Sequence, residues 1–133
     1  MMLASISLFA SQANYEAKIY NAIFNALFPA KRTIYVWSDS KQKSDILRQI
    51  SATQSVDSKE DADILLLSKT KNIDTKTMKF VTNYQLLKHY KKSAVGGFYW
   101  KKGRPNIIFL KKNLDKYHIS LPQSMQEYVE DEL

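Results

Sequence analysis

Hydrophobic positions recur at helical spacing near the start of the chain. Between residues 14 and 28, one apolar face begins at Tyr15, and a second stripe contains Tyr20, Phe24 and Phe28. Two apolar faces indicate a helix that is buried on two sides, so part of it could also contact a partner. The residue types predict a helix that is capped by Asn14 and stopped by Pro29.

Apolar runs alternate with polar, periodic segments along the rest of the chain. Runs rich in β-branched and aromatic residues predict strands at residues 33–37, 62–68, 79–82, 94–100 and 105–110. Helices are predicted at residues 41–50 and 85–91, with a helical turn at 113–117 and a last helix that has Pro122 in its first turn.

This alternation predicts an α/β fold in which a mostly parallel sheet is flanked by helices. The last two strands are separated only by residues 101–104, in which Gly103 can adopt a positive φ angle. They therefore predict a late antiparallel hairpin at the edge of the sheet. The neighbouring Gly96 and Gly97 indicate a close approach of backbone within a strand.

The length of 133 residues is typical of a single domain. Residues 1–13 contain no charge, and a short apolar stretch is followed by Ser11-Gln12-Ala13, with small residues where a signal peptidase cleaves. This pattern predicts a secretory signal, with cleavage after Ala13 and a mature α/β domain at residues 14–133. The doubled methionine at the start, without basic residues, indicates that translation begins further upstream.

The residues for common catalytic and metal sites are missing from the sequence. There is no cysteine, and the two histidines, His89 and His118, lie in polar, lysine-rich surroundings without a nucleophile motif. No glycine-rich phosphate loop is present. We therefore expect a protein that is not an enzyme and that has no cofactor and no bound metal.

The carboxyl ends of the predicted parallel strands offer the first candidate binding site. Ligands of parallel α/β sheets bind beyond these ends. The polar and aromatic residues at these positions are candidates for a small polar or anionic ligand: Ser38, Asp39, Lys69, Asn83 and Tyr84.

A basic segment offers the second candidate site. The net charge is +7, and residues 85–118 carry nine lysines and arginines against one aspartate, with aromatic residues between them. Such a segment suits phosphates, an anionic small molecule, a lipid headgroup or an acidic protein, and it is equally consistent with a solvated basic surface. For contact with a partner, the apolar and charged extremes of the chain are the candidates: Tyr20, Phe24, Phe28, Trp100, Lys101, Lys102 and Arg104.

Several short segments resemble the YfiR-like family of periplasmic proteins. The similar pieces are the opening helix at residues 15–20, the apolar strand at 62–68, Phe80-Val81-Thr82-Asn83, the Gly96-Gly97-Phe98 triplet, residues 103–109, Leu114 and Ile119-Ser120-Leu121. The resemblance spans roughly residues 15–129. The chain departs from the family in having no cysteine, and in having Phe28-Pro29 without the tryptophan that precedes this proline in the family.

The resemblance implies a periplasmic regulator or sensor that binds a membrane-bound signalling protein, often a diguanylate cyclase. It implies a population shift in which the free protein holds its partner inactive until a signal releases it. Two alternatives stay open: a small-ligand binder with a pocket at the strand ends, and a cytoplasmic nucleic-acid binder that uses the basic hairpin. Export would make nucleic acid a poor partner.

Overall fold

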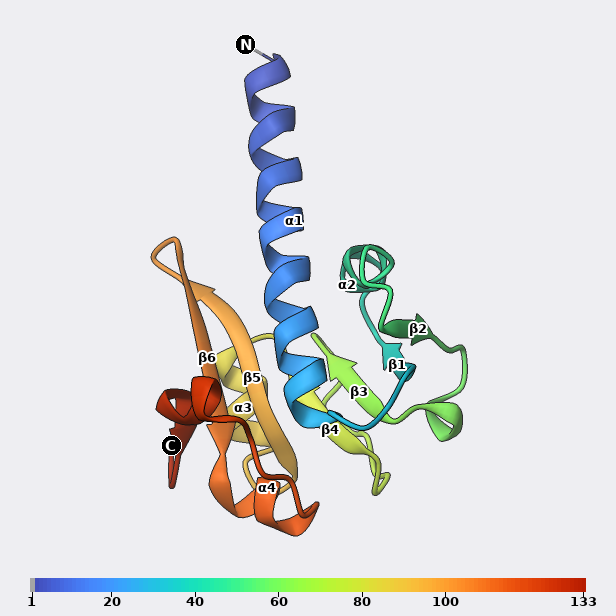
Figure 1. Cartoon of the computed structure of the whole chain (residues 1–133), viewed down its shortest axis with the longest axis vertical. Helices are drawn as coiled ribbons and strands as arrows, with labels where there is room; N and C mark the ends of the chain where they lie inside the picture. Colours follow the sequence, from blue (N-terminus) through green and yellow to red (C-terminus); the bar gives the residue numbers. More distant parts are fainter. Residues whose placement is uncertain (1) are drawn as a thin grey trace.

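The computed structural model of the protein describes the backbone of residues 2–133 and the side chains of residues 12–133. A long helix, α1 (Met2–Leu27), leads into a seven-stranded sheet with the order β2-β1-β3-β4-β5-β6-β7. Figure 1 shows α1 crossing the middle of this sheet, with β5 and β6 on one side and β3, β1 and α2 on the other.

The parallel part of the sheet is built from strand–helix repeats. Parallel pairing runs through the first five strands, in the order β2-β1-β3-β4-β5: β1 (Ile34–Ser38), β2 (Thr53–Ser55), β3 (Ile64–Leu67), β4 (Met78–Val81) and β5 (Ala94–Lys101). Between them lie α2 (Lys41–Leu47), the 3-10 turn η1 (Lys59–Asp61) and α3 (Tyr84–His89).

The last part of the chain forms the antiparallel pair and the closing segment. Strand β6 (Arg104–Leu110) pairs antiparallel with β5 and is followed by α4 (Lys111–Lys116), the 3-10 helix η2 (Gln123–Tyr128) and β7 (Val129–Glu130). The predicted α/β fold with a mostly parallel sheet and a late antiparallel pair is confirmed. The pair lies one strand inside the edge, because β7 joins β6 from outside in parallel.

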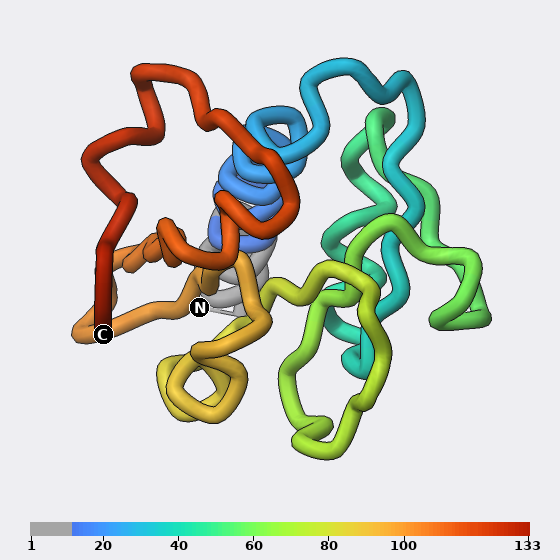
Figure 2. The backbone as a smooth tube through the Cα atoms, turned by 90° about the horizontal axis from the view of Figure 1, so that it is seen from below, coloured from blue at the N-terminus to red at the C-terminus, as the bar shows by residue number. Residues whose placement is uncertain are grey.

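Two apolar cores lie on opposite faces of the sheet. Successive side chains of a strand point to opposite faces, and in β3 Ile64 and Leu66 face α1 and α2 while Leu65 and Leu67 face α3. All four are fully buried, which explains why this strand reads as an uninterrupted apolar run. Figure 2 shows α1 nearly end-on between the two halves of the sheet.

The first helix differs from its predicted bounds. It starts at Met2 and ends at Leu27, so Asn14 lies inside the helix and does not cap it. The physical reason is that no glycine or proline interrupts residues 2–27, so the helical pattern extends through the apolar stretch. The predicted signal segment, residues 1–13, falls largely outside the residues whose side chains are described, and its removal stays a prediction.

Two short strands were not expected from the sequence. Strand β2 has the polar sequence Thr-Gln-Ser and lies at the sheet edge beside β1, where burial of its side chains is not needed. The predicted last helix is instead the 3-10 helix η2 with Pro122 as its N-cap, and Val129 pairs with Phe109 of β6 in β7. Burial of Met125 holds this segment on the core.

The glycine pair of β5 permits the close backbone approach that its sequence indicates. A Cβ atom on Gly96 would lie 2.3 Å from the carbonyl oxygen of Ile108 in β6, and one on Gly97 would lie 3.2 Å from the carbonyl oxygen of Val81 in β4. The neighbouring strands, and not a ligand, occupy the space beside both glycines.

Candidate functional site

The carboxyl ends of β1, β3 and β4 bring together a group of polar side chains, which we call the strand-end cluster: Ser38, Asp39, Ser68, Thr82 and Asn83. The parallel strands β1 and β3 are neighbours in the sheet although the helix after β1 leads to β2 on the other side. Such a reversal of strand order is where open α/β sheets commonly bind ligands.

Asp39 joins the ends of β1 and β3. Its carboxylate accepts hydrogen bonds from the backbone N–H groups of Ser68, Lys69 and Thr70, at 2.7, 3.0 and 2.8 Å. Partial burial acts to raise the pKa of Asp39, but the hydrogen bonds to these three residues together outweigh it and lower the pKa below its ordinary value. The carboxylate therefore stays ionised and fixes the loop after β3.

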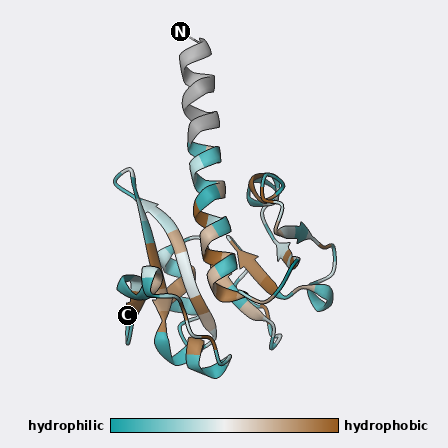
Figure 3. Ribbon diagram, viewed as in Figure 1, coloured by the Kyte–Doolittle hydropathy of each residue, from teal (hydrophilic) through white to brown (hydrophobic). Residues whose placement is uncertain are grey.

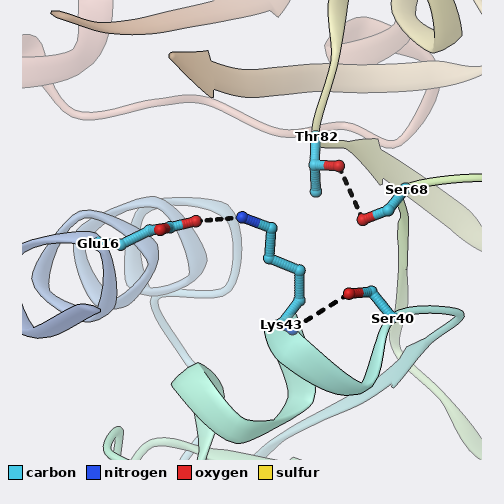
Figure 4. Close-up of polar contacts among 5 residues, drawn as sticks. All are labelled: Glu16, Ser40, Lys43, Ser68 and Thr82. Carbon is cyan, nitrogen blue, oxygen red and sulfur yellow. Dashed lines mark hydrogen bonds and ion pairs between the residues drawn. The ribbon is translucent and has the colours of Figure 1, made fainter. Parts of the chain in front are cut away.

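Hydroxyl and amide groups tie the ends of β3 and β4 in the same way. The Thr82 hydroxyl donates to the Ser68 hydroxyl at 2.7 Å, as Figure 4 shows. Asn83 donates from its amide to the Ser68 carbonyl and accepts from the backbone N–H of Leu86 as the N-cap of α3. Each of these three side chains already has a partner within the chain.

A buried ion pair links the first two helices next to this cluster. The ammonium of Lys43 in α2 contacts the carboxylate of Glu16 in α1, and their side chains are only 15% and 7% exposed. Figure 4 shows the Lys43 side chain directed at Glu16, while its backbone N–H donates to the N-cap Ser40. The sequence contained no signal for this pairing, because the two residues are far apart along the chain and both types are usually solvated.

The strand-end cluster thus clamps loops together. Ser38 accepts from the backbone N–H of Ser40, and Lys69 is exposed with only its backbone engaged. Ligand binding by Ser38, Asp39, Lys69 and Asn83 stays a prediction, and a ligand would have to compete with the internal hydrogen bonds described here.

The Tyr84 side chain takes no part in the hydrogen bonds described for the strand-end cluster, although Tyr84 directly follows Asn83 in the chain. Its ring is 42% exposed and its centroid is 6.0 Å from that of Tyr99. It lines a cavity on the α3 side of the sheet together with lysines of α3 and α4. The Tyr84 side chain therefore lines this cavity, while the side chain of the preceding Asn83 belongs to the strand-end cluster.

The turn between β5 and β6 presents the predicted basic residues to solvent. Lys101, Lys102 and Arg104 are exposed, and Lys102 and Gly103 both have positive φ angles, 53° and 75°, as in a tight hairpin turn. The hairpin extends beyond the rest of the sheet in Figure 1, and its tip is hydrophilic in Figure 3. None of the three cations belongs to an ion pair within residues 12–133.

Aromatic rings lie beside these cations. The Trp100 ring is half-buried, and its centroid lies 6.1 Å from that of Tyr15 in α1 and 5.8 Å from that of Phe98. Tyr15 is 51% exposed. The indole N–H of Trp100 is shielded from solvent and has no hydrogen-bond acceptor among the described residues. We call Tyr15, Trp100, Lys101, Lys102 and Arg104 the aromatic–basic surface.

The prediction that Tyr20 and Phe24 form a contact surface is wrong. Both side chains are fully buried, because the stripe that they form on α1 packs on the sheet against Phe98 and Phe80. Phe28 is half-buried at the end of the helix and packs against the same core. The side of α1 beside the hairpin exposes Tyr15 and not Tyr20 or Phe24. The sequence analysis assigned Tyr15 only to the first apolar face of the helix.

The described residues hold no group of three or more histidine, cysteine, aspartate or glutamate side chains that could bind a metal ion. His89 and His118 are both exposed, and His89 contacts the carbonyl of Lys71 through Nε2. Among the described helices, none combines the length and the apolar character needed to cross a bilayer.

Comparison with known proteins shows the fold alone. No family model and no curated protein matches the chain. The chain is similar to the crystal structure of an ABC domain in complex with L-Trp from Streptococcus pneumonia, with a TM-score of 0.51 and 13% sequence identity. The match covers 82% of this chain and 59% of that one, so the present chain spans little more than half of its structural neighbour.

Proposed function

We propose that this protein is an exported, non-catalytic binding domain that regulates a membrane-bound signalling protein by direct contact through the aromatic–basic surface. The observation that carries the proposal is the Tyr15–Trp100 ring pair beside three exposed cations that lack an acidic partner within residues 12–133. The resemblance to YfiR-like regulators supports the same role and the periplasm as its location.

The chemistry of this surface suits a protein partner. Tryptophan, tyrosine and arginine are the residue types that contribute most to protein interfaces, and all three occur within this one surface. Exposed cations favour an acidic partner, because complementary charge accelerates encounter and excludes wrong partners.

The mechanism that follows is a population shift. The protein would bind one conformation of its partner's exported domain more tightly than the other, and its release would let the other conformation predominate. A tenfold difference in affinity between the two conformations corresponds to about 1.4 kcal/mol. Loss of a few contacts at the hairpin would be enough to remove such a difference.

The experiment compares a charge reversal at the hairpin with a matched reversal elsewhere. In source cells that lack the native copy, K101E/K102E is expected to abolish regulation of the membrane signalling output, while K41E/K71E, which reverses two exposed lysines away from the hairpin, leaves it intact. Both proteins must first be recovered from the periplasmic fraction, with the intact mass of a chain that begins at Asn14. Equal output from the two variants, or a full-length cytoplasmic product, would contradict the proposal.

Small-ligand binding is the second candidate function. The structural neighbour is described as a complex with L-Trp, and the cavity beside Tyr84 supplies a specific place for a ligand in this chain. Nucleic-acid binding is the third, and binding of RNA or DNA by the full-length cytoplasmic product, with a steep dependence on salt, would favour it.

A further inference from the structure

A cavity of about 730 Å³ lies between α3, α4 and residues 131–133, on a different part of the molecule from the hairpin turn. Besides Tyr84 and Asn113, its wall is dominated by five lysines from two helices and the turn between α3 and β5: Lys88, Lys91, Lys92, Lys112 and Lys116. The basic segment of the sequence is thus divided into two separate surfaces, one at the hairpin turn and this one.

The positive charge of this cavity is only partly neutralised by the chain. None of the five lysines forms an ion pair within residues 12–133. Lys116 donates to the backbone carbonyl of Lys92 at 2.7 Å, and the Lys88 ammonium lies 5.7 Å from the centre of the Tyr84 ring. Five ammonium groups around one cavity repel one another, so an anion that enters it relieves this repulsion.

A buried asparagine holds the two lysine-bearing walls together. The Asn113 amide donates to the carbonyl oxygens of Lys91 and Ala94, at 2.9 and 2.6 Å, and its side chain is almost completely buried. These bonds fix α4 against the turn that follows α3. The spacing between the lysines of the two walls is therefore set by the fold, which reduces the entropy lost when a ligand binds them together.

Two acidic residues line the same cavity. Asp131 and Glu132 follow directly after β7, whose pairing with β6 anchors them beside the lysines. Neither carboxylate lies within ion-pair distance of a lysine. Counted over side chains alone, five lysines against two carboxylates leave the cavity wall a net charge of about three positive units at neutral pH.

We propose that this cavity binds a small polyanion with three or more negative charges, of the polyphosphate type, and that Asp131 and Glu132 weaken its binding. Lysine is a compact point charge that binds phosphate oxygens without a fixed geometry. A ligand with three or more charges matches the excess charge of the wall, while a single orthophosphate does not. The site is independent of the aromatic–basic surface.

The test is a titration of the full chain with tripolyphosphate and with orthophosphate, measured by calorimetry at low salt. Saturable one-to-one binding is expected for tripolyphosphate, at least about tenfold tighter than for orthophosphate. K88Q/K112Q, which removes one charge from each helix wall, should weaken tripolyphosphate binding by about tenfold or more, and K41Q/K71Q, with the same change in net charge, should alter it less than about twofold. D131N/E132Q should tighten it several-fold.

Three results would overturn this inference. One is the absence of saturable tripolyphosphate binding. Another is equal weakening by K88Q/K112Q and K41Q/K71Q, which would show attraction to net charge only. The last is binding to phosphatidylglycerol vesicles, sensitive to K88Q/K112Q, without binding of tripolyphosphate, which would assign the lysines to a membrane surface. Thermal unfolding of each variant ensures that the comparison is between folded proteins, and none of these results depends on the hairpin.

Discussion

Replacement of Asp39 by asparagine tests whether the strand-end cluster is a structural clamp. The carboxylate accepts three backbone hydrogen bonds, from Ser68, Lys69 and Thr70. Hydrogen bonds to a charged group contribute about 1.5–3 kcal/mol each when they are well buried. Asp39 is only half-buried, so water replaces part of what is lost, and we expect D39N to lower the free energy of unfolding by about 2 kcal/mol at pH 7.

The pH dependence gives this prediction a second, independent readout. The pKa of Asp39 in the folded protein lies below its ordinary value, which in the unfolded chain is about 3.9. The contribution of the carboxylate to stability is therefore fully present above about pH 4 and is lost as the pH falls through the folded pKa. The difference between wild type and D39N should shrink over that acidic range.

The assay is urea unfolding followed by circular dichroism from pH 7 to about pH 3. Asp45 supplies the control, because its ion pair with Arg48 is long, at 3.5 Å, and both side chains are mostly exposed, so D45N should cost less than about 0.5 kcal/mol. Equal stability of D39N and wild type at pH 7, or a difference that does not change with pH, would refute this account of the clamp.

Three further substitutions test other parts of the structure by the same assay. E16Q leaves the Lys43 ammonium buried without its counter-charge and should lower the free energy of unfolding by about 3 kcal/mol. The double variant E16Q/K43M should restore most of that stability. A loss below about 1 kcal/mol for E16Q would mean that water reaches the pair. Y20F removes a buried hydroxyl without a partner among the described residues and should stabilise the protein by about 1 kcal/mol, whereas destabilisation would reveal a hydrogen bond. G96A places a methyl group against the backbone of Ile108 and should cost at least about 2 kcal/mol. G103N meets open space, and asparagine tolerates the positive φ of 75° better than other non-glycine residues, so this variant should cost no more than about 1 kcal/mol.

The elements with strong local patterns could be predicted from the sequence. The apolar runs of β3 and β5 and the turn at Gly103 led to the correct sheet type and the correct antiparallel pair. Their residues are buried on both faces or adopt positive φ angles, and these requirements restrict the residue types directly. Strand β2, with only polar residues at the sheet edge, carries no such restriction and was not predicted.

The partners of the polar residues could not be predicted in the same way. The position of Asp39 at a strand end was predicted, but its role depends on three backbone N–H groups about thirty positions further along the chain. The same holds for Glu16 with Lys43 and for Tyr15 with Trp100, which meet only after α1 crosses the sheet. The apolar stripe of Tyr20 and Phe24 indicated burial correctly, but periodicity alone does not tell a core from a partner surface.

The division of the basic segment into two sites also required the fold. In the sequence, residues 85–118 form one continuous excess of positive charge. Strands β5 and β6 carry Lys101 and Lys102 to the hairpin tip, while α3 and α4 gather Lys88 and Lys112 around the cavity. Asp131 and Glu132, which follow β7, complete the wall of that cavity.

Site-specific photo-crosslinking in source cells can show whether the hairpin contacts a membrane-bound signalling protein. A photoreactive residue at position 102, in the aromatic–basic surface, is compared with one at position 54, which is exposed on β2 at the opposite edge of the sheet. We expect a single adduct in the membrane fraction from position 102, lost with R104E, and none from position 54. No adduct from position 102, or the same adduct from both positions, would contradict it.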